Sequence, residues 1–422
     1  STLALVFLVA LPTLAVLLIL IIINVGPLYG RMQSAIDQVN RCIQENLTAI
    51  RVVKSYVRGD YEVEKFGVVN ENLKSESEKA FGTAVLNMPA MQFVMYGTIL
   101  GILLIGGRLI NEGQMMIGQL TSFLSYVLLI LNSLMMMSNV FLLMTRSLAS
   151  AERIMEVIDE KIDITDENAK DIAVAKGEIE FDHVWFKYKD TAKEYVLSDV
   201  SFHIKPGQTV GIIGQTGSSK TTLVQLIPRL YDVTKGEEKI DGINVKEYPV
   251  RHLRDAVAMV LQKNTLFSGS LIDNLRWGNE NATLDEIKEA CQIACVDEFV
   301  DRLADGYDTG MGQEGVNVSG GQKQRICIAR AILKKPKVLI LDDSTSAVDT
   351  ATEAKIRSGL AEKLPDMTKI IIAQRISSVR HADQIIIMDR GHVEAIGTHE
   401  SLLRDNQIYQ EIYASQKEGA DL

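Results

Sequence analysis

The chain has 422 residues, a net charge of −10 and 47% hydrophobic residues. This length predicts two or three domains, and the acidic balance argues against the basic surface of a nucleic-acid-binding protein. The four cysteines form no Cys-x-x-Cys pair and indicate reduced thiols in a cytosolic domain. Because the chain starts inside an apolar run, without a basic leader or a cleavage site after the run, we expect it to begin part-way through a longer protein.

Three apolar runs predict three membrane spans, at residues 3–23, 89–107 and 116–144, since about 20 apolar residues cross a bilayer. Basic residues follow the first run and place that end in the cytoplasm; they are Arg31, Arg41, Arg51, Lys54 and Arg58. Residues 28–85 are polar and amphipathic, which predicts long helices beyond the membrane with a turn near residues 34–43. An odd number of spans puts the rest of the chain in the cytoplasm.

The third predicted span carries Ser125, Asn132 and Asn139 at seven-residue spacing, so on one helix face. Polar groups within a bilayer usually face other helices. This face is compatible with hydrogen bonds between helices or with the lining of a polar cavity.

Residue 177 begins a region of short strands that alternate with helices. Strands are predicted at 179–181, 184–188, 201–204, 210–213, 338–341 and 369–372, with a helix-rich section over 285–333. Buried strands that alternate with helices predict an α/β domain with a mostly parallel sheet. The predicted organisation is therefore an all-α transmembrane domain over 1–158, a charged linker over 159–176 and an α/β domain over 177–422.

A phosphate-binding loop is predicted at residues 211–224, GIIGQTGSSKTTLV, between a strand and a helix. Its amides would surround an anion, Lys220 would reach the outer phosphates, and the Thr221 hydroxyl would bind Mg²⁺. Ser219 stands where the Gly-x4-Gly-Lys-Thr pattern has its second glycine, and would be strained if that position requires a glycine conformation. The predicted nucleotide contacts in the loop are Gly214, Gln215, Thr216, Gly217, Ser218, Ser219, Lys220, Thr221 and Thr222.

Two carboxylates end the buried strand at residues 338–341. Asp342 is predicted to bind Mg²⁺, and Asp343 lies where a general base or water-orienting group acts.

VSGGQKQR at residues 318–325 resembles the signature motif of ATP-binding-cassette (ABC) exporters, in which six spans precede a nucleotide-binding domain. The resemblance covers nearly the whole chain, from the fourth span onward, and implies ATP and Mg²⁺ as ligands. It implies that Tyr188 stacks on adenine and that Gln262 joins Mg²⁺ and relays to the membrane domain. Residues 309–315 would touch membrane-domain helices, although Glu314 is shifted from the usual pattern, and residues 346–349 would cross a dimer interface. Residues 36–43 would dock on a partner's nucleotide domain.

Two positions depart from the family pattern. The family has Glu after the magnesium aspartate and His in the later turn, and this chain has Asp343 and Gln374. The shorter side chain withdraws the carboxylate by one methylene, and a misplacement of about 1 Å can cost on the order of 100-fold in rate. Glutamine cannot carry a proton as histidine does. Together with Ser219, these changes predict a site that binds ATP and hydrolyses it poorly.

The intact signature predicts a heterodimer. This chain would hold ATP in a degenerate site and lend Ser319, Gly320, Gly321 and Gln322 to a competent site on a second ABC half-transporter. The predicted function is ATP-driven export of a small amphipathic or hydrophobic substrate across a bacterial plasma membrane, with drugs, lipids and peptides all left open. The alternatives are a non-hydrolysing regulatory subunit, an ATP-gated channel half, or a homodimer with two slow sites. The predicted spans exclude a soluble DNA-repair ATPase.

Overall fold

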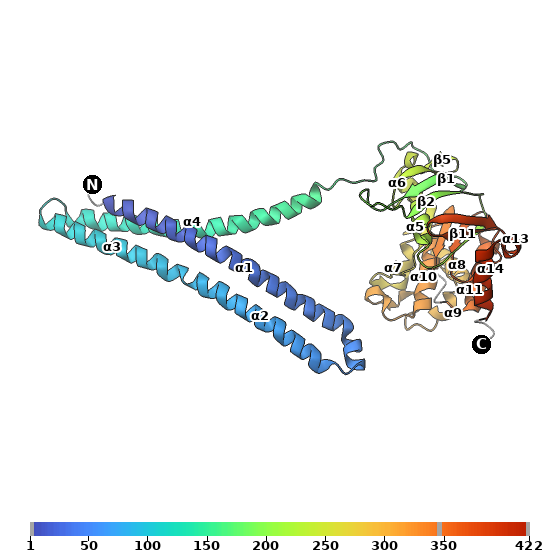
Figure 1. Cartoon of the computed structure of the whole chain (residues 1–422), viewed down its shortest axis with the longest axis horizontal. Helices are drawn as coiled ribbons and strands as arrows, with labels where there is room; N and C mark the ends of the chain where they lie inside the picture. The colour runs from blue at the N-terminus through green and yellow to red at the C-terminus, as the bar shows by residue number, and fades with distance from the viewer. Residues whose placement is uncertain (1–3, 344–347, 419–422) are drawn as a thin grey trace. The chain divides into compact units, whose positions relative to one another are not determined.

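The computed structural model describes residues 4–343 and 348–418. The chain divides into two compact units, Ser1–Glu160 and Lys161–Leu422. Figure 1 shows the first as long helices and the second as sheets covered by short helices. Each unit is described by itself.

The first unit consists of long helices that reverse direction at tight turns. They are α1 (Ala4–Ser55), α2 (Gly59–Val85), α3 (Asn87–Asn111) and α4 (Ile117–Ile158). The predicted turn near residues 34–43 is wrong, because α1 continues through it and the chain reverses at residues 56–58. Residues 31–58 contain no glycine or proline, and Gly59 is the first helix breaker after Gly30. The predicted docking segment at 36–43 therefore lies in mid-helix.

Small side chains let α1 and α2 pack closely in the first unit. Ala35, Cys42 and Ala80 are buried. Polar contacts extend the interface: Asn46 Nδ2 donates to Glu62 Oε2 at 2.9 Å. The hairpin of α1 and α2 is therefore joined along its length by side chains from both helices.

The apolar stretches of the first unit overlap the predicted spans but differ from them in extent. Within the described residues, Gly59–Asn111 is long and apolar enough to cross a membrane, and Leu8–Leu17 and Ile117–Ile130 are shorter apolar helical stretches. Ser125 Oγ donates to the Thr121 carbonyl of its own helix at 3.1 Å. The side chain of Asn139 lies outside the described residues, so both interpretations of this polar face stay open.

A six-stranded sheet forms the centre of the second unit. Its order is β12-β11-β3-β10-β9-β6, and all neighbours are parallel except β11 and β12. The strands are β3 (Thr209–Ile213), β6 (Val257–Val260), β9 (Val338–Asp342), β10 (Thr368–Ile372), β11 (Gln384–Asp389) and β12 (His392–Gly397). All residues of β9 and β10 are buried, as expected for strands covered on both faces. The predicted mostly parallel sheet is confirmed.

The second unit also contains an antiparallel sheet of order β2-β1-β4-β5. Its strands are β1 (Ile179–Phe186), β2 (Leu197–Ile204), β4 (Lys235–Ile240) and β5 (Ile243–Asn244). The two strands predicted at 179–181 and 184–188 are one strand, β1, whose register shifts after Phe181 and Val184. His183 has a φ of 49° within this irregularity, which is typical of a bulge. Tyr188 lies beyond the end of the strand.

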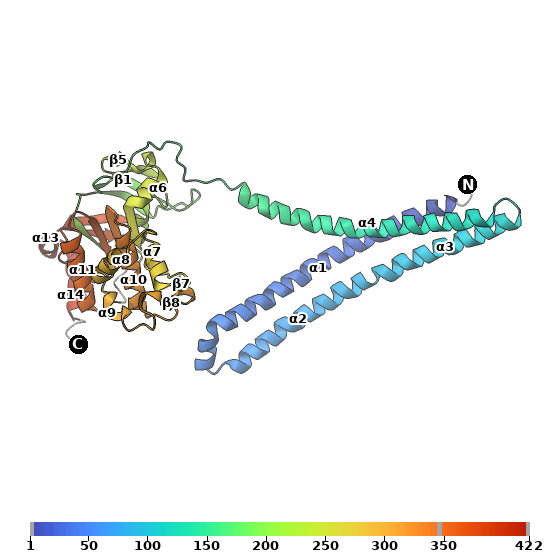
Figure 2. The same ribbon diagram turned by 180° about the vertical axis from the view of Figure 1, so that it is seen from behind.

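Short helices and a small ribbon complete the second unit (Figures 1 and 2). The helices are α5 (Lys220–Leu226), α6 (Val250–Ala256), α7 (Leu271–Arg276), α8 (Leu284–Ile293), α9 (Asp297–Val300), α10 (Gly320–Leu333), α11 (Thr350–Lys363), α12 (Ile376–Val379), α13 (His399–Asp405) and α14 (Gln407–Glu418). The ribbon pairs β7 (Gly269–Ser270) with β8 (Gly310–Met311), and 3₁₀ turns occur at Val245–Glu247, Gly306–Asp308 and Gln313–Gly315.

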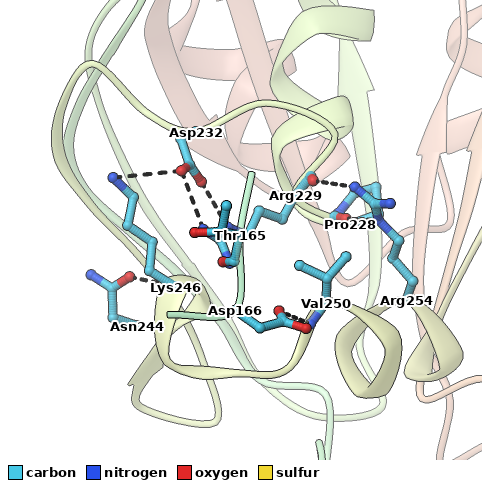
Figure 3. Close-up of polar contacts among 9 residues, drawn as sticks. All are labelled: Thr165, Asp166, Pro228, Arg229, Asp232, Asn244, Lys246, Val250 and Arg254. Atoms are coloured by element: carbon cyan, nitrogen blue, oxygen red, sulfur yellow. Dashed lines mark hydrogen bonds and ion pairs between the residues drawn. The ribbon is translucent and has the colours of Figure 1, made fainter. Parts of the chain in front are cut away.

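Part of the predicted linker is fastened to the second unit (Figure 3). Arg229, which is 4% exposed, donates to the Thr165 carbonyl at 3.3 Å and pairs with Asp232 at 2.8 Å. Asp166 Oδ1 accepts the Val250 amide at 2.8 Å. The chain is thus held from Thr165 onward.

Candidate nucleotide site

Four parallel strands deliver their carboxyl ends to one edge of the sheet. Ile372 of β10 is in register with Asp342 of β9 on one side and with Ile212 of β3 on the other. Val260 of β6 is in register with Leu341. Because ligands of open α/β sheets bind beyond the carboxyl ends of the strands, the loops that follow these strands form the candidate site.

The phosphate loop connects β3 to α5 and is closed by its own lysine. Lys220 Nζ donates to the carbonyls of Gly214 and Gln215, both at 2.8 Å, and lies 3.2 Å from Ser218 Oγ. Burial lowers the pKa of Lys220, and the charges of Asp343 and Asp342 oppose this shift. The ammonium group of Lys220 therefore donates to loop carbonyls in this structure. When a nucleotide binds, it would donate to phosphate oxygens instead.

Ser219 adopts the left-handed conformation that favours glycine, with φ 70° and ψ 22°. The position therefore does require the glycine conformation that the loop pattern suggested. A residue with a Cβ pays roughly 1–2 kcal/mol in this region. Ser219 is also the N-terminal flanking residue of α5, and its side chain makes no capping hydrogen bond there. The serine therefore adds backbone strain to the loop, and no capping hydrogen bond from its side chain offsets this strain.

Thr221 and Asp342 form the predicted magnesium pair. Thr221 Oγ1 donates to Asp342 Oδ1 at 3.0 Å, whereas Asp342 Oδ2 is buried and has no hydrogen-bond partner in the described part of the chain. Burial raises the pKa of Asp342, the Thr221 hydroxyl lowers it, and the Asp343 charge raises it further. A buried carboxylate oxygen without a donor, beside a hydroxyl, fits the oxygen ligands of Mg²⁺.

Asp343 lies next to Asp342 and is surrounded by amide groups. Its Oδ2 accepts a hydrogen bond from Gln374 Nε2 at 2.7 Å and a longer one from Gln262 Nε2 at 3.4 Å. Its own amide donates to the Ile372 carbonyl, and its φ is 47°. The three predicted residues from the ends of β6, β9 and β10 are thus brought together by hydrogen bonds.

Tyr188 stands beside the phosphate loop, half exposed. Its hydroxyl lies 2.9 Å from Thr222 Oγ1, and its ring packs edge-on against Tyr231 with centroids 5.1 Å apart. Because the Tyr188 side chain is about half exposed, its ring is accessible to an aromatic ligand while the hydroxyl lies against α5. Tyr231 was not predicted from the sequence.

The signature motif forms a separate helix start. Ser319 is the N-cap of α10, and its amide and hydroxyl exchange hydrogen bonds with Gln322 in a capping box. Ser319 and Gly320 are exposed, and Gly321 and Gln322 are half-buried. An exposed helix N-terminus leaves amides available to an anion from outside the chain.

Two other predicted segments are only partly described. Residues 344–347, which include Ser346, lie outside the described residues; Asp349 accepts the Thr352 amide at 2.9 Å and caps α11. Glu314 is exposed with φ 54° in the turn before the signature.

Gln416 on α14 makes a contact with the Gln374 turn that was not predicted from the sequence. Its side-chain amide binds the Gln374 carbonyl and the Ile376 amide, which lie 42 and 40 residues away along the chain. No local pattern in the sequence could have indicated it.

Comparisons with known proteins agree with this geometry. Residues 197–346 match the family described as ABC transporter, and residues 1–134 match the ABC transporter transmembrane region. The chain is 41% identical over 416 residues to the "Uncharacterized ABC transporter ATP-binding protein YfiB" of Bacillus subtilis, covering 98% of this chain and 72% of that protein. It is 36% identical over 407 residues to the "Putative multidrug export ATP-binding/permease protein YgaD" of the same organism, covering 93% and 69%. The structure of a bacterial Atm1-family ABC exporter with ATP bound is similar with a TM-score of 0.89 and 27% identity, covering 99% of this chain and 73% of that one.

Proposed function

The chain belongs to the ABC transporter family as an exporter half-transporter, and on this premise we propose that it is the degenerate half of an asymmetric pair. It is a membrane protein with a transmembrane region and a cytoplasmic ATPase domain. In the proposed pair, this chain's own site holds ATP and turns it over slowly. Its signature completes a faster site on a different half-transporter.

The binding half of this proposal is supported by the residues that face the ligand. Lys220 would hold the outer phosphates, and Tyr188 would stack on adenine. Thr221, Asp342 and Gln262 would hold Mg²⁺, which neutralises phosphate charge during transfer. Asp342 Oδ2, which has no hydrogen-bond partner among the described residues, is the observation that favours a cation here.

The slow-hydrolysis half depends on Asp343, and this is the observation that carries the proposal. The aspartate carboxylate is one methylene closer to the backbone than that of glutamate, and Gln374 donates to it at 2.7 Å. An oxygen that already accepts amide protons has less capacity to take a proton from an attacking water. Gln374 can donate to a phosphate but cannot shuttle a proton.

The exported substrate is proposed to be small and amphipathic or hydrophobic, because it would be collected from a bilayer by apolar helices. YgaD, whose printed name refers to multidrug export, is 36% identical to this chain. Bacterial relatives favour the bacterial plasma membrane as the site of action.

A groove beyond Gln262 is a suitable place for the relay to the membrane domain. Phe267 and Trp277 stack there with centroids 4.1 Å apart, and Trp277 is 65% exposed. The cavity beside them has a volume of about 300 Å³. We propose that the helix turn of the partner that corresponds to residues 56–58 docks here.

Two substitutions distinguish the asymmetric pair from a homodimer. The complex would be purified through a tag on this chain from the membranes in which it is made, and its mass measured. Ser319→Ala should reduce phosphate release at least about tenfold, because it removes a donor to the competent site. Lys220→Ala should reduce it far less, because it disables only the slow site.

A homodimer predicts another pattern. Both sites would then need both residues, so Lys220→Ala would abolish hydrolysis as fully as Ser319→Ala. A mass equal to two copies of this chain together with equal losses would rule out the asymmetric pair.

A further inference from the structure

The C-terminal helix holds the turn that carries Gln374. Gln416 Nε2 donates to the Gln374 carbonyl at 2.7 Å, and Gln416 Oε1 accepts the Ile376 amide at 2.9 Å. One side-chain amide thus uses its donor and its acceptor on two backbone groups that flank Arg375. This two-point contact fixes both the position and the orientation of the turn between β10 and α12.

Helix α14 is itself well anchored. Tyr409 is fully buried, its hydroxyl lies 2.7 Å from His399 Nδ1, and its amide donates to Asn406 Oδ1 at 2.8 Å. Ile412 and Tyr413 pack against the main hydrophobic core. α14 also packs against α12 and α13. The helix can therefore serve as a fixed support for Gln416.

A second support holds the other end of the same turn. Arg357 of α11 donates to the carbonyls of Ser377 and Ser378 at 3.2 and 3.1 Å. The backbone that follows β10 is thus held at residues 374 and 376 by α14 and at residues 377 and 378 by α11. The side chain of Gln374 is left to reach Asp343.

The same helix borders the phosphate loop. A cavity of about 550 Å³ is lined by Gln215, Gly217 and Ser218 of the loop and by Glu411 and Ser415 of α14. Gln416 follows Ser415 directly, so α14 lies beside both the loop that would bind phosphate and the turn that would sense it.

We propose that Gln416 is a positioning residue for nucleotide discrimination: it holds the 374–376 turn so that the Gln374 amide reaches the terminal phosphate of a nucleoside triphosphate. This rests on the proposed nucleotide-binding role of Gln374. Glutamine has a flexible side chain, so its reach is useful only if its backbone is fixed, and displacements near 1 Å matter at such sites. We call the contact of Gln416 with the Gln374 carbonyl and the Ile376 amide the latch. A diphosphate lacks the terminal phosphate and therefore gains nothing from the latch.

The test compares triphosphate and diphosphate binding by the full chain in detergent. Affinities for adenylyl imidodiphosphate and ADP, each with Mg²⁺, are measured by calorimetry for the wild type, Gln374→Ala and Gln416→Ala. Losing the latch should lower the triphosphate affinity relative to ADP by roughly three- to tenfold, the effect of about one hydrogen bond. Gln416→Glu should fall between, because its carboxylate accepts the Ile376 amide but cannot donate to Gln374.

The matched control is Gln407→Ala on the same helix, because the Gln407 side chain donates to Glu411 of α14 at 2.8 Å. It should leave the affinity ratio unchanged. In Gln374→Ala/Gln416→Ala the ratio should equal that of Gln374→Ala, since both residues would act through one contact.

Hydrogen exchange supplies a readout that needs no nucleotide. The Ile376 amide should exchange faster in Gln416→Ala than in Gln407→Ala. An unchanged affinity ratio in Gln416→Ala, while Gln374→Ala loses it, would overturn the latch alone. If Gln374→Ala also kept the wild-type ratio, the proposed phosphate contact of Gln374 would be wrong, and the latch with it. Equal weakening of both nucleotides would indicate general destabilisation and would also overturn the latch.

Discussion

Gln374 Nε2 donates to Asp343 Oδ2 at 2.7 Å, so the two residues that depart from the family pattern are direct partners. Asp343 is 8% exposed, and Gln262 approaches the same oxygen at 3.4 Å. The substitutions at positions 343 and 374 therefore both alter the surroundings of one atom, Asp343 Oδ2. A glutamate at 343 would extend beyond this contact, and a histidine at 374 could accept as well as donate a proton.

Restoring both family residues should recover hydrolysis at this chain's own site. We expect Asp343→Glu with Gln374→His, in a Ser319→Ala background, to release phosphate about tenfold faster than Ser319→Ala alone. The Ser319→Ala background suppresses hydrolysis at the site on the partner, so any gain in phosphate release arises at this chain's own site. The gain should remain below the 100-fold scale of a 1 Å correction, because the partner's signature would complete this site and we expect it to be altered in an asymmetric pair. Adding Lys220→Ala is the control and should return the rate to background.

The strain at Ser219 gives a prediction about stability. Ser219→Gly removes the cost of a left-handed residue and should raise the free energy of unfolding by about 1 kcal/mol. For a unit of this size, the melting midpoint should rise by about 2–4 °C. Trp185 and Trp277 are the only tryptophans of the chain and both belong to the Lys161–Leu422 unit, so their fluorescence reports its melting.

The control for Ser219 is its neighbour two residues earlier. Gly217 has φ 86°, and a Cβ added there would meet no atom within 4 Å. Gly217→Ser should therefore lower the midpoint through backbone conformation alone. A lower midpoint in Ser219→Gly would show that the serine contributes a contact that outweighs its strain.

Local sequence patterns predicted the nucleotide site because its parts are local. The phosphate loop, the buried strand that ends in Asp342 and the capped helix after Ser319 are each specified by a few adjacent residues. Their convergence follows from parallel strands that share one edge. The sequence alone therefore predicts that Lys220 and Asp342 belong to one site.

Features that depend on distant contacts or on small differences in helix propensity were not predictable. The polar pattern of α1 continues past residue 43 and does not mark the end of the helix, so only Gly59, the first helix breaker after Gly30, indicates the turn at residues 56–58. The register shift near His183 is set by pairing with β2 and β4. The contact from Gln416 to Gln374 spans 42 residues and depends on how α14 packs.

Glu238 predicts an unusual dependence of stability on pH. It is 1% exposed on β4, neither of its carboxylate oxygens has a hydrogen-bond partner among the described residues, and Asp232 adds negative charge. Burial therefore raises its pKa from 4.5 to about 8. Between these values the folded state keeps the proton that the unfolded state has released. Stability should fall as pH rises from 4.5 and level off above 8.

Glu238→Gln should remove this dependence, because its amide stays neutral. Near pH 5 the variant and the wild type should melt at similar temperatures, and the variant should gain steadily up to pH 8. At pH 7 the gap corresponds to about 3 kcal/mol. Glu237→Gln, at an exposed neighbouring position, should show no such trend. A constant gap across this range would mean that Glu238 is ionised in the folded protein.

The fastened linker predicts a specific protease sensitivity (Figure 3). Asp166→Ala removes the acceptor for the Val250 amide, a contact of 2.8 Å. The segment that follows should then detach more often, and trypsin should cut after Lys170 about five times faster, as expected from the loss of about 1 kcal/mol. Lys170 is a suitable reporter because its amide donates to the Glu247 carbonyl at 2.7 Å when the segment is held.

The control is Glu167→Ala, which changes an exposed carboxylate in the same segment without touching the Val250 contact or the residues that flank the scissile bond. Its cleavage rate after Lys170 should match that of the wild type. Tryptophan fluorescence should show the same melting midpoint for both variants, because the core of the nucleotide unit is unaltered. If Asp166→Ala left cleavage unchanged, the contacts of Arg229 with Thr165 and of Glu247 with Lys170 would be sufficient to hold the linker. If cleavage rose together with a fall in the midpoint, Asp166 would instead support the whole unit.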